Sequence, residues 1–209
     1  MGKSSAILII ACGAIAREIV ALRTLNQWPH MVIQCLPADL HNRPEKIAPA
    51  VREKIHANRG KFSSMFVAYG DCGTGGELDA VLDEERVERL PGAHCYEFYA
   101  GTEPFAAMTE EEIGTFYLTD FLLQHFDRLI IRGLGIEKHP ELLPIYFGNY
   151  KKLVYLAQIE NGQKIEQGRN AAARLGLEYS YRFTGYGDLA HSLAHVAAGI
   201  STGVIAWQN

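Results

Sequence analysis

Three cysteines stand in segments where the sequence pattern predicts that a strand meets a loop. Cys12 lies in the stretch ACGAI, Cys72 in YGDCGTGG and Cys95 in HCYEFY. Ligands of open α/β sheets bind at the carboxyl ends of the strands, so we expect these thiols to converge at one edge. Cys95 opens its predicted strand, so it reaches that edge only if this strand runs antiparallel to the others. Because thiolates are soft ligands that suit zinc, copper(I) and iron–sulfur clusters, the pattern predicts a metal centre.

The predicted centre has three sulfur ligands, or two sulfurs together with His94 or a carboxylate. Three protein ligands around zinc leave one coordination position for water or a substrate thiol, and zinc is the metal that we favour. A [4Fe–4S] cluster with one open iron is the alternative. The chain has no CxxC pair, so its spacing is not that of a zinc ribbon or a ferredoxin. The fourth cysteine, Cys35, is expected to be a buried small hydrophobe inside its strand.

The glycine-rich turn around Cys72 is the second candidate feature. Glycines let a backbone turn tightly and approach a ligand. The N–H groups that open the following helix favour an anion, and the same field is expected to lower the pKa of the Cys72 thiol. The turn matches neither GxGxxG nor GxxxxGK[ST], so a nucleotide is not the favoured ligand. The candidate cofactor-binding residues are Gly70, Gly73, Thr74, Gly75 and Gly76.

Carboxylate and imidazole groups in the same segments are candidates for acid–base chemistry or for orienting a substrate. One precedes Cys72, one follows the second predicted strand in LHNRP, and two follow Cys95. Such groups transfer protons when they lie within hydrogen-bonding reach of the reacting atoms. The predicted catalytic residues are Asp71, His41, Glu97 and Glu103.

Apolar runs typical of strands alternate with helical spacing along the chain. This order predicts an α/β fold, a three-layer αβα sandwich with a mostly parallel, doubly wound (Rossmann-like) sheet. We expect a single domain over residues 1–209, with a helical insertion at about 107–150. The predicted strands are 6–11, 31–36, 64–69, 94–99, 152–158 and 177–183. The predicted helices are 14–25, 44–60, 76–85, one that begins at Thr109, a long one over 115–131, and 140–150, 162–176 and 187–199.

Composition excludes two classes of partner. The 209 residues carry a formal net charge of -4, and Lys and Arg are scattered, so nucleic acid is not an expected partner. No apolar run approaches the roughly 20 residues that span a bilayer, so no membrane partner is expected. The apolar N-terminal run passes directly into a helical pattern, which favours a first strand over a signal peptide. We therefore expect a cytoplasmic location.

The segments ACG, LHNRP, YGDCGTGG and HCYEFYAG, with FYLTDFL after them, resemble a microbial family of unknown function, number 1638 in the domain-of-unknown-function series. The resemblance extends over nearly the whole chain. It implies no defined activity. It does imply a setting of corrinoid-dependent methyl transfer and methylated-amine use, in which a corrinoid protein or a methyltransferase is the partner.

The leading hypothesis is a metal-dependent enzyme that acts on a small-molecule substrate. A zinc ion at the thiols would keep a bound thiol or water deprotonated, and in the methyl-transfer setting that group would attack a methyl donor such as a methylcorrinoid. One alternative is a protein that binds or delivers a metal, a cluster or a corrinoid without turnover. Another is a metal-free enzyme with Cys72 as nucleophile and His41 or His94 as base.

Overall fold

The computed structural model describes residues 5–199, and these form helices and parallel strands. The predicted α/β class is confirmed. The chain divides into two compact units, unit 1 with Met1–Phe98 and Asp188–Asn209 and unit 2 with Tyr99–Gly187, and each has its own parallel sheet. The prediction of a single domain stays a prediction. Within residues 5–199, no helix combines the length and apolarity that crossing a bilayer requires.

Unit 1 is built on a parallel sheet of four strands in the order β2-β1-β3-β4. The central strand β1 is buried along its whole length, as the apolar run ILIIAC predicts for a strand covered on both faces. The chain leaves β1 on one side to form β2 and returns to the other side to form β3. The four strands are β1 (Ile7–Cys12), β2 (Met31–Leu36), β3 (Ser64–Ala68) and β4 (Glu88–Arg89).

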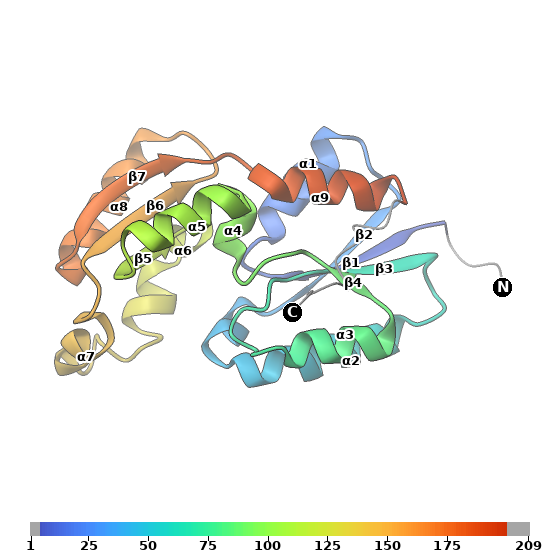
Figure 1. Ribbon diagram of the computed structural model, residues 1–209, viewed down its shortest axis with the longest axis horizontal. Coiled ribbons are helices and arrows are strands. Elements are labelled where there is room, and N and C mark those ends of the chain that lie inside the picture. The colour runs from blue at the N-terminus through green and yellow to red at the C-terminus, as the bar shows by residue number, and fades with distance from the viewer. Residues whose placement is uncertain (1–4, 200–209) are drawn as a thin grey trace. The chain divides into compact units, whose positions relative to one another are not determined.

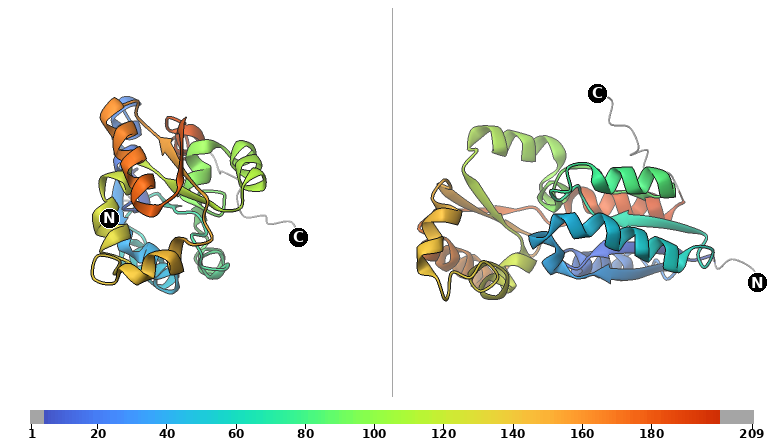
Figure 2. Two further views of the ribbon diagram at one scale, coloured as in Figure 1. Left: turned by 90° about the vertical axis from the view of Figure 1, so that its left-hand side faces the viewer. Right: turned by 90° about the horizontal axis from the view of Figure 1, so that it is seen from below.

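Helices cover both faces of this sheet. Figures 1 and 2 show α1 (Ala16–Leu25) and α9 (Gly187–Ala197) on one face, and α2 (Ile47–Asn58) and α3 (Glu77–Glu85) on the other. Two short 3₁₀ turns, η1 (Ala38–Asn42) and η2 (Pro44–Lys46), join β2 to α2. The predicted αβα layering is therefore present in this unit.

The predicted strand over residues 94–99 is wrong, because this segment is the helix α4 (Cys95–Ala100). Its aromatic residues suit a strand by composition. The edge position beside β3 is instead taken by the two-residue strand β4. Since β4 already runs parallel to β3, the loop after it brings Cys95 to the carboxyl end of the sheet without an antiparallel strand.

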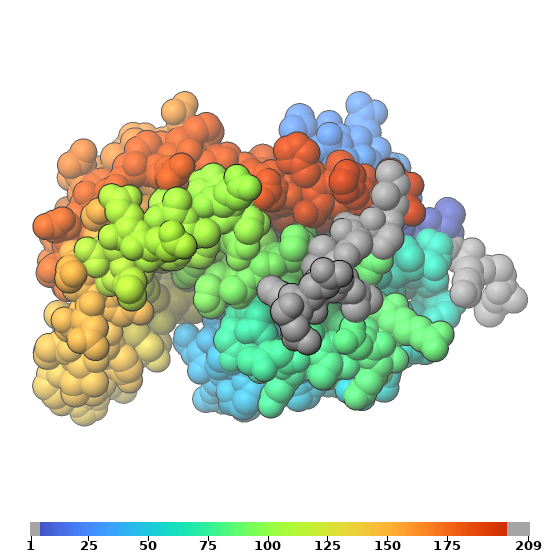
Figure 3. Space-filling model, in the orientation of Figure 1, coloured from blue at the N-terminus to red at the C-terminus, as the bar shows by residue number. Residues whose placement is uncertain are grey.

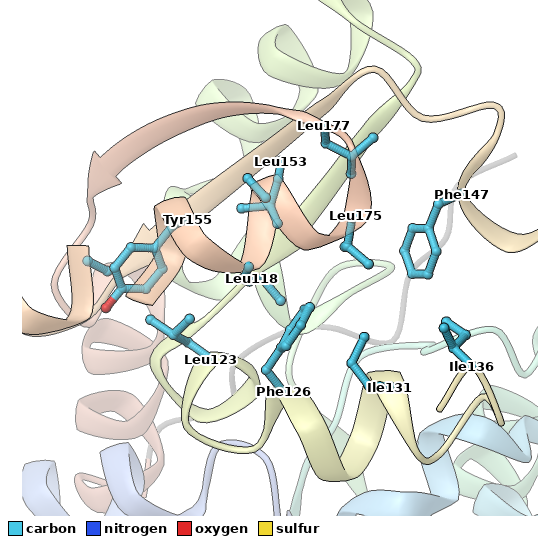
Figure 4. Close-up of a cluster of buried hydrophobic side chains, with 13 residues drawn as sticks. Leu118, Leu123, Phe126, Ile131, Ile136, Phe147, Leu153, Tyr155, Leu175 and Leu177 are labelled. Atoms are coloured by element: carbon cyan, nitrogen blue, oxygen red, sulfur yellow. The ribbon is translucent and has the colours of Figure 1, made fainter. Parts of the chain in front are cut away.

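Unit 2 has a three-stranded parallel sheet in the order β5-β6-β7. Leu118, Leu153 and Leu175 lie in one buried cluster between this sheet and the helices that pack on it (Figure 4). The ring centroids of Phe105 and Tyr117 are 5.0 Å apart. Most other side chains of α5 (Thr102–Glu111) are exposed (Figure 3). The strands are β5 (Thr115–Leu118), β6 (Lys152–Ala157) and β7 (Glu178–Phe183), and the helical segments are α5 (Thr102–Glu111), α6 (Asp120–Gln124), the π-helix η3 (Asp127–Ile131), η4 (Pro140–Leu142), α7 (Leu143–Phe147) and α8 (Gly162–Leu175).

The long helix predicted over 115–131 is also wrong. Its first four residues form β5, which pairs with β6, and Thr119 then begins α6 by accepting a hydrogen bond from the N–H of Leu122. A continuous apolar run does not distinguish a buried strand from a buried helix, and here pairing with β6 decides. The helix start predicted at Thr109 is wrong as well, because α5 begins at Thr102 and the Thr109 hydroxyl donates to the Phe105 and Ala106 carbonyls.

A buried carboxylate lies at the carboxyl end of the sheet of unit 2. The Tyr155 hydroxyl donates a hydrogen bond to Oδ1 of Asp120 at 2.5 Å, and the Lys164 ammonium donates to Oδ2 at 2.7 Å. The backbone N–H of Asp120 donates to Oε1 of Gln158 at 2.8 Å. Each oxygen of this carboxylate thus has a partner, as a buried charge requires.

Candidate functional site

The strand order of unit 1 reverses direction between β1 and β3. The loops that follow these two neighbouring strands therefore diverge, and such a switch point is where ligands of open α/β sheets bind. Cys12 is the last residue of β1, and Cys72 lies in the loop that follows β3. The fold thus places two of the three predicted ligands at the two sides of the switch point.

Cys12 is buried and lies against a histidine. Its side chain is 2% exposed, and its Sγ accepts a hydrogen bond from the Ala14 N–H at 3.4 Å. The same Sγ is 3.6 Å from Nδ1 of His41, which η1 holds at the end of β2. Burial raises the pKa of the Cys12 thiol to about 11, and burial lowers the pKa of His41. Both groups are therefore neutral near pH 7.

Cys72 has a backbone conformation that L residues rarely adopt. Its φ is 51°, in the left-handed region that costs a residue with a Cβ about 1–2 kcal/mol. Its N–H donates to the Ala93 carbonyl at 2.8 Å, and the preceding Asp71 N–H donates to the Gly92 carbonyl at 3.2 Å. Gly70 suits this close approach, because a Cβ there would lie only 3.1 Å from the Gly92 carbonyl oxygen. The turn is thus bonded directly to the loop that precedes Cys95.

The expectation that the helix start lowers the pKa of Cys72 is wrong. Burial, followed by the neighbouring Cys12, raises the pKa of this thiol to about 12. The hydrogen bond from the Gly70 backbone and the charge of Arg89 act in the opposite direction but do not offset these effects. Loss of hydration is the largest of these effects.

Cys95 joins the other two thiols. It begins α4 and is 8% exposed. Burial raises its pKa well above the ordinary value, and the next largest contributions come from Cys72 and Cys12. Each of the three sulfurs thus lies close enough to another for their charges to interact. Tyr69 is 1% exposed, and burial, followed by Cys12 and then Cys72, raises the pKa of its hydroxyl, so this group interacts with two of the thiols.

The glycine turn is closed by its own carboxylate. Asp71 Oδ1 accepts hydrogen bonds from the Thr74 hydroxyl at 2.5 Å and the Gly76 N–H at 3.0 Å, and Oδ2 accepts from the Gly75 N–H at 3.2 Å. Partial burial alone would raise the pKa of Asp71, but these hydrogen bonds together lower it. The N–H groups that could cradle a bound anion are therefore directed at an anion of the chain itself.

The two other predicted catalytic carboxylates are Glu97 on α4 and Glu103 on α5. Glu97 bends back and accepts the Ala93 N–H at 2.9 Å, so that it closes the loop before α4. Gly92, with a φ of 100°, makes room for this carboxylate. Glu103 is exposed on α5 and belongs to unit 2. His94 is exposed and lies close enough to His41 to lower its pKa.

A family model described as "Protein of unknown function (DUF1638)" matches residues 35–193, which is most of the chain. The chain belongs to this family. The matched region of this DUF1638 protein includes His41, Cys72 and Cys95 and begins after Cys12. No curated protein and no solved structure matches the chain.

Glu18 of this DUF1638 protein is a buried carboxylate that interacts with the thiol group and was not among the predicted site residues. It is 7% exposed on α1, and after burial, Cys72 and Cys12 its charge also contributes to the raised pKa of Cys95. A signal was present in the sequence. Glu18 adjoins Ile19 and precedes Leu22 by four positions, which places a carboxylate on the apolar face of the helix.

Cys35 does not have the position that was predicted for it. The thiol is exposed rather than buried, because β2 is the edge strand of its sheet.

Among residues 5–199 of this DUF1638 protein, no group of three or more His, Cys, Asp or Glu side chains is arranged so that it could hold a metal ion. The three thiols are thus brought together but are not in a coordinating geometry.

Proposed function

We propose that unit 1 binds a soft metal ion through the sulfurs of Cys12, Cys72 and Cys95, with His41 as the adjacent nitrogen donor. The observation that carries the proposal is the convergence of three buried, mutually interacting thiols at the switch point of the sheet. In the metal-free protein these thiols keep their protons. A bound ion would displace these protons, and the four side chains would have to turn from their metal-free positions to coordinate it.

Burial favours a metal over a free nucleophile. A nucleophilic cysteine needs a thiolate that a substrate can reach. Here the pKa values of Cys12 and Cys72 are raised to about 11 and about 12, and each of the three side chains is at most 8% exposed. A bound cation compensates the charge of a buried thiolate and deprotonates it outright.

The backbone of Cys72 supports the same proposal by an independent route. Glycine would adopt a φ of 51° without strain, and four glycines already stand in this turn. Strained residues cluster at functional sites, where the side chain is needed in that place. The position thus favours a role for the sulfur itself.

Zinc is the metal that we propose first, and a [4Fe–4S] cluster is the alternative. When bound, zinc would supply Lewis-acid activation of a thiol or water, for methyl transfer with a small-molecule substrate and a corrinoid protein or methyltransferase as partner. The burial of all three sulfurs favours a second candidate, a binding or delivery protein without turnover, because closed metal sites are typical of non-catalytic roles.

The test is the metal content and absorption spectrum of the full chain purified without oxygen. We expect about one zinc per chain and no colour, or brown protein with iron and sulfide. The variant Cys72→Ser is expected to lose the metal and keep its fold by circular dichroism. The matched control Cys35→Ser, at the exposed cysteine, is expected to keep the metal. Wild-type protein that stays metal-free after reconstitution with zinc, and with iron and sulfide, would contradict the proposal.

A further inference from the structure

A buried arginine forms hydrogen bonds with the segments next to two of the three thiols. Arg89 is on β4 and is 2% exposed. Its Nε and Nη2 donate to the two carboxylate oxygens of Asp79 at 2.5 and 2.9 Å. Its Nη1 donates to the carbonyls of Leu90 at 2.6 Å and Gly92 at 3.1 Å. One guanidinium thus binds a carboxylate and two backbone carbonyls at once.

Each of these partners belongs to an element that positions a thiol. Asp79 lies in the first turn of α3, the helix that begins directly after the Cys72 turn. Leu90 and Gly92 lie in the loop between β4 and Cys95. The Gly92 carbonyl, which Arg89 orients, also accepts the N–H of Asp71 at 3.2 Å. Arg89 therefore connects α3, which follows the Cys72 turn, to the loop that precedes Cys95.

The chemistry of arginine suits this task. The planar fork of the guanidinium pairs with a carboxylate through two parallel hydrogen bonds and has further N–H groups for other acceptors. Lysine offers one nitrogen on a flexible stem and cannot hold the same acceptors in a fixed arrangement. The charge of Arg89 also acts on Cys72 directly, in the direction that favours a thiolate.

We propose that Arg89 is a positioning residue of the thiol site, which holds the Cys72 and Cys95 loops in register so that both sulfurs can bind the same ion. This inference rests on the proposed function. Groups that orient metal ligands without touching the metal typically contribute about 10- to 100-fold to metal affinity. Arg89→Lys keeps the buried charge and loses the fork, so it isolates the geometric role.

The first experiment is a cobalt(II) titration of the full-length, metal-free protein, followed by the thiolate-to-cobalt charge-transfer absorption. Arg89→Lys is expected to raise the Kd for cobalt about 10- to 100-fold and to lower the absorption per bound cobalt, since fewer sulfurs remain bound. The control is Arg52→Lys, which alters an arginine that pairs with Glu84 at the surface, and it is expected to match the wild type. Wild-type affinity and spectrum in Arg89→Lys would overturn the inference and leave the proposed function standing.

The second experiment needs no metal. Amide hydrogen exchange at Asp71 and Cys72 is expected to accelerate in metal-free Arg89→Lys, while the amides of β1 stay protected. If the wild type binds no cobalt, the proposed function fails, and unchanged exchange at these two amides would then overturn the positioning role as well. If Arg89→Lys does not fold, Asp79→Asn replaces it, because this variant removes the ion pair and keeps the contacts to Leu90 and Gly92. The cobalt titration and the hydrogen exchange are then measured on Asp79→Asn, with the same expected and contradicting results.

Discussion

The Sγ atom of Cys12 lies 3.6 Å from Nδ1 of His41, and this contact joins the end of β1 to the turn after β2. It places one sulfur and one nitrogen side by side at the switch point of unit 1. The exposed His94 lies nearby and offers a matched comparison.

If His41 is the nitrogen donor of the metal site, His41→Ala should weaken zinc or cobalt binding by at least the roughly 10- to 100-fold that loss of a ligand-orienting group costs, because it removes a ligand itself. His94→Ala should change the affinity far less, because the ring is exposed. Competition titration with a chromophoric chelator measures both constants. The reverse order of effects would assign the nitrogen to His94.

The left-handed backbone of Cys72 predicts an unusual order of stabilities. In metal-free protein, Cys72→Gly should be more stable than Cys72→Ala by about 1 kcal/mol, because alanine keeps the Cβ that disfavours a φ of 51°. Urea unfolding of the two variants measures the difference. A more stable alanine variant would show that the loop relaxes to an ordinary conformation.

The four thiols should differ in reactivity. In native, metal-free protein a disulfide reagent such as Ellman's reagent should modify about one thiol per chain rapidly, because Cys35 is exposed and the other three are buried. The rapid phase should vanish in Cys35→Ser. A rapid phase that instead maps to Cys72 would favour the metal-free nucleophile.

The buried hydroxyl of Tyr155 predicts a dependence of stability on alkaline pH. Burial, together with the hydrogen bond to Asp120, raises the pKa of Tyr155 above its ordinary value near 10. The folded state therefore keeps this proton above pH 10 while the unfolded chain loses it, so the stabilisation is fully present below pH 10 and declines as pH rises.

The variant Tyr155→Phe isolates this contribution. At neutral pH it should be less stable than the wild type by about 1–3 kcal/mol, since it loses a hydrogen bond to a buried carboxylate. Above pH 10 the difference should narrow by about 1.4 kcal/mol per pH unit. Urea unfolding from pH 8 to 11 measures it, and a difference that is constant with pH would contradict the assignment.

The carboxylate of Asp71 should stabilise the fold by closing the glycine turn. Asp71→Ala should lower the free energy of unfolding by about 0.5–2 kcal/mol, as the loss of a helix-capping side chain does. Asp39→Ala, at an exposed aspartate on η1, is the control and should be close to neutral. Equal effects of the two substitutions would remove the special role of Asp71.

Much of unit 1 follows from local pattern. The run MVIQCL predicts a strand over 31–36, and β2 has these same bounds. The helical spacing over 14–25 and 76–85 likewise predicts α1 and α3 to within two residues. The placement of Cys12 and Cys72 after parallel strands follows from the same alternation, because the carboxyl ends of parallel strands share one edge. The candidate site was therefore visible in the sequence.

Tertiary contacts decided what local pattern could not. Residues 94–99 and 115–118 have compositions that suit more than one element, and the pairing of β4 with β3 and of β5 with β6 settled them. The exposure of Cys35 depends on β2 being an edge strand, and strand order is a property of the whole sheet.

The sequence by itself determined which residues have the chemistry for a thiol site and which strands carry two of them. Only the tertiary structure decided that the thiols are buried and protonated and that the charge of Glu18 acts on Cys95. It also decided that Arg89 donates hydrogen bonds to the loop before Cys95. The physical reason is that burial and charge–charge interactions depend on distances between residues far apart in the chain, and these distances are not encoded in any local period.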